Sequence, residues 1–410
     1  MKETKNVPQL RFSGFDDEWE EKKLGDTICE VNERTSDFNK NPLFSLTIEN
    51  GITEKTERYE RSQLVTKDDD LFKIMHPQNF ATNPMNLRFG AVGYSKEKQD
   101  ISVSGYYDVF SIDNNECSDF WYSYFKTDKI LKKFDDAATG SLIEKRRVHF
   151  SVLKQLVFLQ PNYKEKQKIG AFLSHVDSLI QAKTKKLESL KAVKKSLLQK
   201  CFPKAGEKVP EMRFAGFSGD WEENTIGEIA EIITGGTPST LHEDYWFPKE
   251  IPWLSSGEVN KKYVTFTDDF ISKKGFNNSS AHWIKENSVL IALAGQGKTR
   301  GTVAINMIPL TTNQSIAGII LNNEMDTNFV FQSLERKYDA IRKMSSGDGS
   351  RGGLNKQLVS EITFMCPPKL EEQQKIGQFF SKYDSLISAQ QKEIDKLKDI
   401  KKSLLQKMFI

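Results

Sequence analysis

The chain has few cysteines, and they lie far apart. Cys29, Cys117, Cys201 and Cys366 contain no C-x-x-C pair, which excludes the usual spacing of a structural zinc site and of a disulfide framework. The five histidines also lack the spacing of metal ligands. We therefore expect reduced cysteines and no metal site.

Long apolar runs are missing as well. The longest run, VLIALA at residues 289–294, is far shorter than the roughly 20 residues that a membrane helix needs. The first residues, MKETKN, contain no apolar stretch typical of a signal peptide. We expect a cytoplasmic protein with no part in the membrane.

A strong overall charge is missing too. Lys and Arg total 59 and Asp and Glu total 56, so the net charge is only +3 over 410 residues. No global basic field points to nucleic acid. The lysines are nevertheless uneven, because seven of them and a single acidic residue, Glu188, lie between Lys183 and Lys200. A local basic strip of this kind matters more than the total charge.

What the chain has instead is an internal repeat. Four short motifs occur twice: VPQLRFSGF (7–15) as VPEMRFAGF (209–217), WEE (19–21) as WEE (221–223), QKIGAF (167–172) as QKIGQF (374–379), and KKSLLQK (194–200) as KKSLLQK (401–407). We call residues 7–21 and 209–223, together with residues 161–204 and 367–410 that contain the other two motifs, the frame. The intervening segments, about 13–160 and 215–366, show almost no likeness. A repeated frame with different contents suggests two recognition domains on one scaffold.

Each variable segment is expected to be rich in strands. Short apolar stretches broken by Gly, Asn and Pro predict strands, for example at residues 43–48, 101–107, 251–254, 289–294 and 302–305. Residues 119–134 and 329–344 predict a helix that closes each segment. Gly-containing basic loops follow at residues 140–147 and 347–356. The predicted fold class is α+β.

The clearest elements are two long helices behind Pro161 and Pro368. Apolar residues recur every 3.5 residues in both, which predicts a coiled coil, and residues 165–202 would span about 55 Å at 1.5 Å per residue. We expect the helices to pack antiparallel through Leu173, Val176, Ile180, Leu187, Leu190, Leu197, Phe380, Tyr383, Ile387, Ile394, Leu397 and Leu404. Polar residues interrupt both stripes at the same places: Lys183, Lys194, Gln390 and Lys401. The predicted parts are two domains, 1–160 and 205–366, and two helices, 161–204 and 367–410.

No motif supports catalysis. The segment AGQGKT at residues 294–299 resembles a phosphate-binding loop, but Ala292 stands where that motif needs its first Gly. Cys366 precedes Pro367-Pro368 where amino-methyltransferases have Asp or Asn. We expect a non-catalytic chain with no cofactor of its own.

Binding groups are more plentiful. Arg, Asn and Gln recognise base edges, whereas Lys, Ser and Thr hold phosphates. The candidate DNA-binding residues are Asn86, Arg88, Tyr94, Lys96, Lys145, Arg146, Arg147, Gln296, Lys298, Thr299, Arg300, Asn313, Gln314, Arg351, Asn355 and Lys356.

The repeated motifs resemble the specificity subunit of type I restriction–modification enzymes. The resemblance rests on WEE followed by Leu24-Gly25 or Ile226-Gly227, on QKIG followed by DSLI (177–180 and 384–387), on KKSLLQK-x-F, and on IITGGTP (232–238) with TNQS (312–315). It implies two target-recognition domains, each recognising one half of a split, asymmetric sequence of double-stranded DNA. It also implies that the helices act as a spacer and dock two modification subunits, which carry S-adenosylmethionine and methylate adenine. Restriction subunits would carry ATP, Mg, translocation and cleavage.

Two other functions stay open on the residues alone. The chain is alternatively a non-catalytic coiled-coil adaptor that joins two protein-binding domains, or an enzyme whose active site has no recognisable motif. Retention of duplex DNA with a steep loss on adding salt would distinguish DNA recognition from the adaptor.

Overall fold

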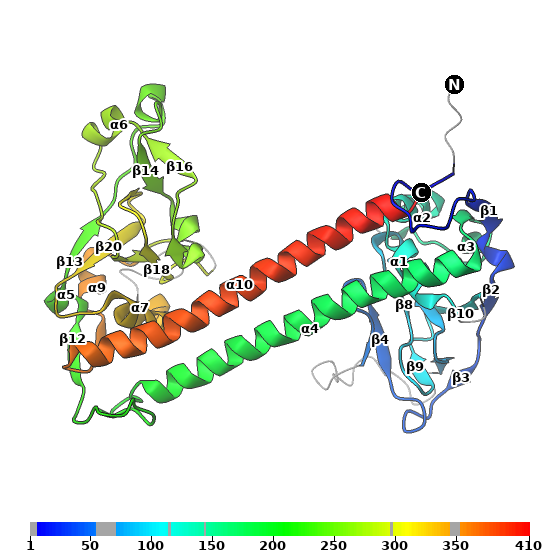
Figure 1. Cartoon of the computed structure of the whole chain (residues 1–410), viewed down its shortest axis with the longest axis horizontal. Helices are drawn as coiled ribbons and strands as arrows, with labels where there is room; N and C mark the ends of the chain where they lie inside the picture. Colours follow the sequence, from blue (N-terminus) through cyan, green and yellow to red (C-terminus); the bar gives the residue numbers. More distant parts are fainter. Residues whose placement is uncertain (1–5, 55–70, 114–115, 143–144, 296–297, 345–352) are drawn as a thin grey trace. The chain divides into compact units, whose positions relative to one another are not determined.

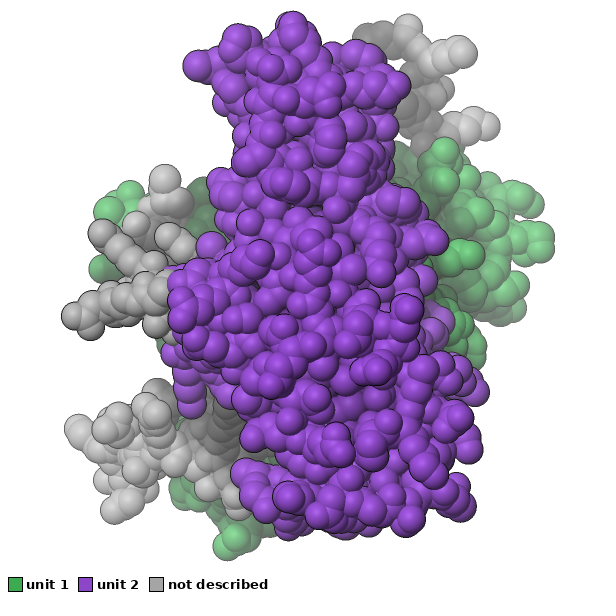
Figure 2. Space-filling model, turned by 90° about the vertical axis from the view of Figure 1, so that its left-hand side faces the viewer, with its two compact units in different colours: residues 1–185, 392–410 green, residues 186–391 purple. Residues whose placement is uncertain are grey.

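The structure is a computed structural model that describes residues 6–54, 71–113, 116–142, 145–295, 298–344 and 353–410. The chain forms two compact units (Figure 2): unit 1 contains residues 1–185 and 392–410, and unit 2 contains residues 186–391. The two long helices are α4 (Tyr163–Cys201) and α10 (Leu370–Met408) (Figure 1). Each unit therefore takes one part of each helix.

Unit 1 is built on a four-stranded sheet with the strand order β2-β10-β7-β8. Its strands are β2 (Ile28–Glu30), β10 (Asp108–Ile112), β7 (Phe80–Thr82) and β8 (Val92–Tyr94). The smaller sheets are β3 (Arg34–Thr35) with β6 (Phe72–Met75) and β9 (Ile101–Val103), β4 (Phe44–Thr47) with β5 (Gly51–Glu54), and β1 (Glu20–Lys23) with β11 (Val157–Gln160). The short helices are α1 (Ser118–Phe125), α2 (Asp128–Ala137) and α3 (Phe150–Leu153). Aromatic side chains dominate the core, including the fully buried Phe80, Phe110 and Trp121.

Unit 2 is built on a five-stranded sheet with the order β13-β20-β17-β18-β15. Its strands are β13 (Ala230–Thr234), β20 (Ile316–Leu321), β17 (Val289–Ala292), β18 (Val303–Asn306) and β15 (Tyr263–Val264). The other sheets are β16 (Asp269–Ile271) with β14 (Ile251–Leu254) and β19 (Thr311–Thr312), and β12 (Glu222–Thr225) with β21 (Thr363–Cys366). The short helices are α5 (Ile226–Ile229), α6 (Lys273–Asn277), α7 (Thr327–Arg336), α8 (Tyr338–Lys343) and α9 (Lys356–Ser360).

Strand β17 shows why its sequence is continuously apolar. Val289 and Ile291 belong to one hydrophobic cluster, whereas Leu290 and Ala292 belong to another. Successive side chains of a strand point to opposite faces of the sheet. Both faces of this sheet are therefore covered, and every residue of the strand is buried.

The two variable segments share a strand order despite their unlike sequences. The antiparallel order β2-β10-β7-β8 of unit 1 recurs as β13-β20-β17-β18 in unit 2. Helix α1 follows β10 as α7 follows β20, and each lies against a repeated glycine of a long helix. A Cβ on Gly170 would lie 2.7 Å from the nitrogen of Phe120, and a Cβ on Gly377 would lie 2.9 Å from that of Phe329. Because only glycine allows this approach, the QKIG motif occurs in both copies.

The frame makes the same contacts in both units. Arg11 forms a bidentate ion pair with Glu165, with distances of 2.7 and 2.7 Å. Arg213 pairs with Glu372 in the same way, at 2.7 and 2.8 Å. Both glutamates are almost fully buried. Backbone contacts repeat as well, because Leu10 donates to the carbonyl of Lys407 as Met212 donates to that of Lys200. The predicted internal repeat is confirmed.

Helices α4 and α10 pack antiparallel within each unit. In unit 1, Asp177 of α4 pairs with Lys401 of α10, and Lys183 of α4 pairs with Glu393 of α10. Residue numbers therefore rise along α4 while those of the partners fall along α10. In unit 2, Lys194 pairs with Asp384 at 2.8 Å. All twelve predicted positions of the helix pair are buried or half-buried. The predicted antiparallel coiled coil is confirmed, and none of the described helices is long and apolar enough to span a membrane.

Two of the predicted helices are interrupted. Residues 119–134 form α1 and α2, and residues 329–344 form α7 and α8. In unit 1 the backbone of Thr127 is extended, and its hydroxyl donates to the carbonyl of Tyr124 at 2.8 Å. That bond satisfies one of the free carbonyls at the end of α1. The prediction of one continuous helix is wrong at this position in both units. The predicted domain limits, by contrast, stay a prediction.

Candidate nucleic-acid interface

Three loops of unit 2 meet at one end of the five-stranded sheet. Strand β13 ends at Thr234 and β17 ends at Ala292, and both ends lie beside the start of β20 at Ile316. The segments that leave the sheet there are residues 235–238, the described residues 293–295 and 298–302, and residues 313–315. The N–H of Leu354 donates to the carbonyl of Leu293 at 2.8 Å, which brings residues 353–356 to the same place.

The loop after β13 passes directly over strand β19. A Cβ on Gly235 would lie 2.1 Å from the carbonyl oxygen of Thr312, so only glycine fits here. The hydroxyl of Thr237 then donates to Oε1 of Gln314 at 2.5 Å. The exposed amide of Gln314 is thereby oriented by a residue that was not among the predicted ones.

The other predicted side chains of unit 2 gather at this end. Lys298 is exposed, and Arg300 is half-buried with its guanidinium donating to the carbonyl of Arg342 at 2.9 Å. Asn355 begins α9, where its side chain accepts from the N–H of Leu358 at 2.8 Å. Lys356 is exposed, whereas Thr299 and Asn313 are half-buried. Gln296 and Arg351 lie outside the described residues.

The segment that resembles a phosphate-binding loop lacks the structural context of one. Residues 298–301 form a turn that leads into strand β18, so no helix begins after Lys298. Phosphate-binding loops hold their anion at a helix N-terminus. The geometry gives no support to nucleotide binding there.

Unit 1 gathers most of its predicted residues at the equivalent end of its sheet. Asn86 and Arg88 lie in the loop after β7, and Val148 donates to the carbonyl of Pro84 at 2.9 Å, which brings residues 145–148 beside that loop. Arg88 contacts a carboxylate oxygen of Asp135 at 2.9 Å, and Arg146 donates to the Asp135 carbonyl at 2.8 Å. Lys145 is exposed and Arg147 is half-buried.

Tyr94 and Lys96 lie elsewhere in unit 1. Tyr94 pairs with Phe80, at the opposite end of β7 from the Arg88 loop. Its side chain is buried, and its hydroxyl donates to Asp119. Burial and the Asp119 carboxylate raise the pKa of Tyr94 far above its ordinary value. Lys96 is exposed and lies over the Tyr94 ring at 5.2 Å. The structure does not bring this pair together with the other predicted residues.

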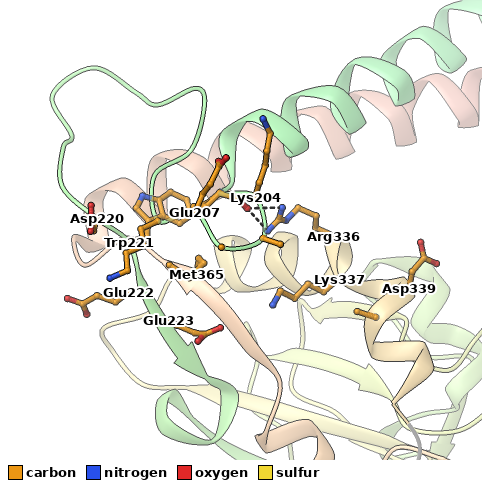
Figure 3. Close-up of a pocket in the computed structure, with 15 residues that line it drawn as sticks. Lys204, Glu207, Asp220, Trp221, Glu222, Glu223, Arg336, Lys337, Asp339 and Met365 are labelled. Carbon is orange, nitrogen blue, oxygen red and sulfur yellow. Dashed lines mark hydrogen bonds between the residues drawn. The ribbon is translucent and has the colours of Figure 1, made fainter.

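An open cleft of about 1060 Å³ lies in unit 2 between the linker at residues 203–208 and helices α7 and α8 (Figure 3). Arg336 donates to the carbonyl of Pro203 at 3.3 and 3.4 Å, and Lys337 donates to that of Thr363 at 2.5 Å. Burial lowers the pKa of both side chains. Carboxylates line the same cleft: Glu207, Asp220, Glu222, Glu223 and Asp339. The two cations therefore hold backbone in place and offer no site for a phosphate.

The family follows from the sequence of both units. Residues 16–192 and 218–399 match the family described as Type I restriction modification DNA specificity domain. This chain belongs to that family. The two matches correspond to the two copies of the frame with the variable segment between them, and the family predicted from the repeated motifs is confirmed.

Specificity subunits of type I restriction enzymes are similar to part of this chain. The type I restriction enzyme MjaIX specificity subunit of Methanocaldococcus jannaschii is 31% identical over 198 residues, which is 47% of this chain and 44% of the relative. The EcoR124I/EcoR124II specificity subunit of Escherichia coli is 27% identical over 175 residues, 42% of this chain and 43% of the relative. The aligned regions thus span less than half of either relative.

A solved structure shows the same fold over nearly the whole length. It is the crystal structure of the type I restriction–modification S subunit from M. genitalium, with a TM-score of 0.68. It is 14% identical in sequence, and the match covers 98% of this chain and 99% of the other. The predicted α+β architecture of the specificity-subunit family is therefore confirmed.

The residues that tie the two long helices to each other by ion pairs were not among the predicted ones. Lys194 and Lys401 appeared only as polar interruptions of the apolar stripes. In the structure each forms an ion pair with an aspartate of the other helix. A polar residue at a buried coiled-coil position indicates a specific partner. The lysines in the two apolar stripes were therefore the sequence signal for these ion pairs.

Proposed function

We propose that this chain is the sequence-specific DNA-binding subunit of a type I restriction–modification complex. Each variable segment would act as a target-recognition domain for one half of a bipartite, asymmetric DNA sequence. The observation that carries the proposal is the pair of equivalent sheet ends, which present different side chains on a repeated frame. Lys298, Arg300 and Gln314 would contact DNA in unit 2, and Asn86, Lys145 and Arg146 in unit 1.

The chain itself would be non-catalytic. Two modification subunits would dock on the helix pair, bind S-adenosylmethionine and methylate adenine in the cytoplasm. Restriction subunits would supply ATP hydrolysis, Mg-dependent cleavage and translocation. Among the described residues, no group of three or more His, Cys, Asp or Glu is arranged to hold a metal ion.

Mapping of methylated adenines tests this proposal. Cells that carry the modification subunits with this chain should methylate one bipartite motif with a fixed gap, and cells without the chain should not. In the purified complex, duplex DNA should be retained and then lost steeply as salt rises, because Lys and Arg release counterions from phosphates. An unchanged methylation map together with no retention of duplex DNA would favour the adaptor.

The helix pair is expected to set the gap between the half-sites. Inserting four residues in α4 after Lys186, with a matched insertion in α10 after Gln391, adds about 6 Å at 1.5 Å per residue. With about 3.4 Å per base pair, the gap should lengthen by roughly one or two base pairs while both half-sites stay the same. Methylation mapping would measure the new gap, and activity on the original gap alone would contradict a spacer role.

A further inference from the structure

A buried charged cluster joins the variable segment of unit 2 to both long helices. The amine of Lys194, on α4, lies 2.8 Å from Glu335 and 2.8 Å from both carboxylate oxygens of Asp384, on α10. Lys262 contacts Glu335 and lies 3.2 Å from Asp384. Gln332 donates to Asp384 at 2.7 Å. Glu335, Lys262 and Gln332 belong to the variable segment, whereas Lys194 and Asp384 belong to the frame.

The cluster is electrically balanced and partly shielded from water. The side chains of Lys194 and Asp384 are only 6% and 3% exposed, whereas those of Glu335 and Lys262 are 26% and 43% exposed. Two cations thus face two carboxylates. Burial opposes the charge on Lys262, but Glu335 and Asp384 outweigh it and raise its pKa. Removing one member alone would leave an uncompensated buried charge.

Unit 1 contains the same pair from the frame with a different partner. Asp177 pairs with Lys401 as Asp384 pairs with Lys194. Glu335 lies six residues after Phe329, and the residue six positions after the equivalent Phe120 is Lys126. The amine of Lys126 donates to the carbonyl of Ile48 and to the hydroxyl of Tyr122, both at 3.0 Å. Lys126 therefore bonds to its own variable segment, whereas Glu335 and Lys262 of unit 2 contact the Asp–Lys pair of the frame.

We propose that Glu335 and Lys262 are positioning residues that fix the orientation of the second recognition domain on the helix pair and so restrict the permitted gap between half-sites. The inference rests on the proposed function. Apolar contacts are non-directional, whereas charge-assisted hydrogen bonds fix geometry. This cluster is a directional link between the domain and both helices, in addition to the hydrogen bonds that Gln373 of α10 exchanges with the backbone of Asp326 and Glu324. Looser links would let the domain turn and accept neighbouring gap lengths.

The double variant Glu335→Gln with Lys262→Gln tests the inference. It removes one acid and one base, and it leaves the buried Lys194–Asp384 pair intact. The variant would be assembled with its modification subunits and titrated with duplexes that carry both half-sites at the cognate gap or at one base pair more or less. Discrimination between the gaps should fall about tenfold, the scale of one charged hydrogen bond, while cognate affinity falls by less. The variants Glu335→Asp and Lys262→Arg should restore most of the discrimination.

Lys274→Gln with Asp244→Asn is the matched control. This ion pair lies in the same domain, and its side chains are 62% and 49% exposed. The control should keep the discrimination of the parent.

Amide hydrogen exchange tests the link without DNA. Exchange in α7 should rise in the Glu335→Gln, Lys262→Gln variant and stay unchanged in the control. Unchanged exchange in α7 would overturn the inference even if the parent binds DNA, and so would increased exchange with undiminished gap discrimination. A parent complex that binds no bipartite duplex would instead overturn the proposed function.

Discussion

Units 1 and 2 make the same contacts to the frame and differ at the ends of their sheets. The bidentate pairs Arg11–Glu165 and Arg213–Glu372 are equivalent. At the sheet end, by contrast, Arg88 is tied to the carboxylate of Asp135, whereas Arg300 donates to the backbone of Arg342 and lies near an exposed Lys298. The comparison teaches that what repeats in this sequence holds each domain in place, and what varies lies where DNA would be contacted.

Exchange of a whole variable segment should have the largest effect. Replacing residues 22–160 with the corresponding segment of a relative should change one half of the methylated motif and leave the other half and the gap as they were. Two or three mismatched base pairs, at about 1–3 kcal/mol each, are enough to abolish recognition of the original half-site. Methylation mapping of the hybrid beside its parent measures this, with replacement of residues 224–366 as the reciprocal control. A simultaneous change in both half-sites would break the comparison.

Removal of the closing aromatic side chain should affect one unit at a time. Phe409 packs against Trp19 and stacks on Tyr124 in unit 1, and Phe202 packs against Trp221 and Phe329 in unit 2. Phe409→Ala and Phe202→Ala should each lower the free energy of unfolding of their own unit by about 3–5 kcal/mol. Hydrogen exchange resolved by unit would measure it. Equal loosening of both units by either variant would show that they unfold together.

The arginines at the two sheet ends should behave differently. Arg300→Ala should cost about 1–3 kcal/mol of DNA binding and relax preference at one base, whereas Lys298→Ala should weaken all sequences alike and reduce the salt slope by about 1. Arg88→Ala should lower the stability of unit 1 and leave base preference unchanged. Competition binding with single-base variants of the target separates these cases. Unchanged binding by both variants in unit 2 would place their loop off the DNA.

Much of the fold could be predicted from the sequence, and less of the candidate site. Heptad spacing predicted a helix at residues 165–202, and α4 spans Tyr163–Cys201, because a periodic apolar stripe is a local property. The meeting of Thr237 with Gln314 depends on strand order across 77 positions, which no local pattern contains. Tyr94 was predicted to contact DNA, but it is buried because strand β8 pairs with β7. No local pattern in the sequence shows that burial either. The break at Thr127, by contrast, is made by a local hydrogen bond from its hydroxyl to the carbonyl of Tyr124.

The smallest expected effect is a pH dependence confined to unit 1. His76 contacts Asp100 at 2.8 Å and Glu33 at 3.3 Å. Burial opposes its charge, but these carboxylates raise its pKa above the ordinary 6.5. The stabilisation of unit 1 by protonated His76 and these carboxylates is therefore fully present below about pH 6.5. It is lost as pH rises through the higher pKa of His76 in the folded state. Solvent screening of this partly exposed group limits it to less than about 1 kcal/mol.

The comparison between units supplies the control for that effect. Unit 2 has Lys285 at the corresponding position, two residues before Asn287, whose positive φ matches that of Gln78. Thermal unfolding would be measured at pH 6 and pH 8 for the parent and for His76→Gln. In the parent, the unit 1 transition should lose stability between pH 6 and pH 8, and in the variant this loss should be smaller. The unit 2 transition should be the same in both proteins. If the stability of unit 1 depends on pH equally in the variant and the parent, a titratable group other than His76 causes the dependence.

The split composition of unit 1 has a consequence for its folding during synthesis. Unit 2 is one continuous stretch, residues 186–391, but unit 1 needs residues 392–410 as well. The ribosome therefore begins unit 1 first and completes it last. Roughly 200 residues must be added before Phe409 arrives, an interval of about 10–40 s at 5–20 residues per second. During that interval Trp19, Phe120 and Tyr124 lack one of their aromatic partners. We therefore expect the nascent first domain to expose part of its aromatic core until synthesis of the chain reaches Phe409.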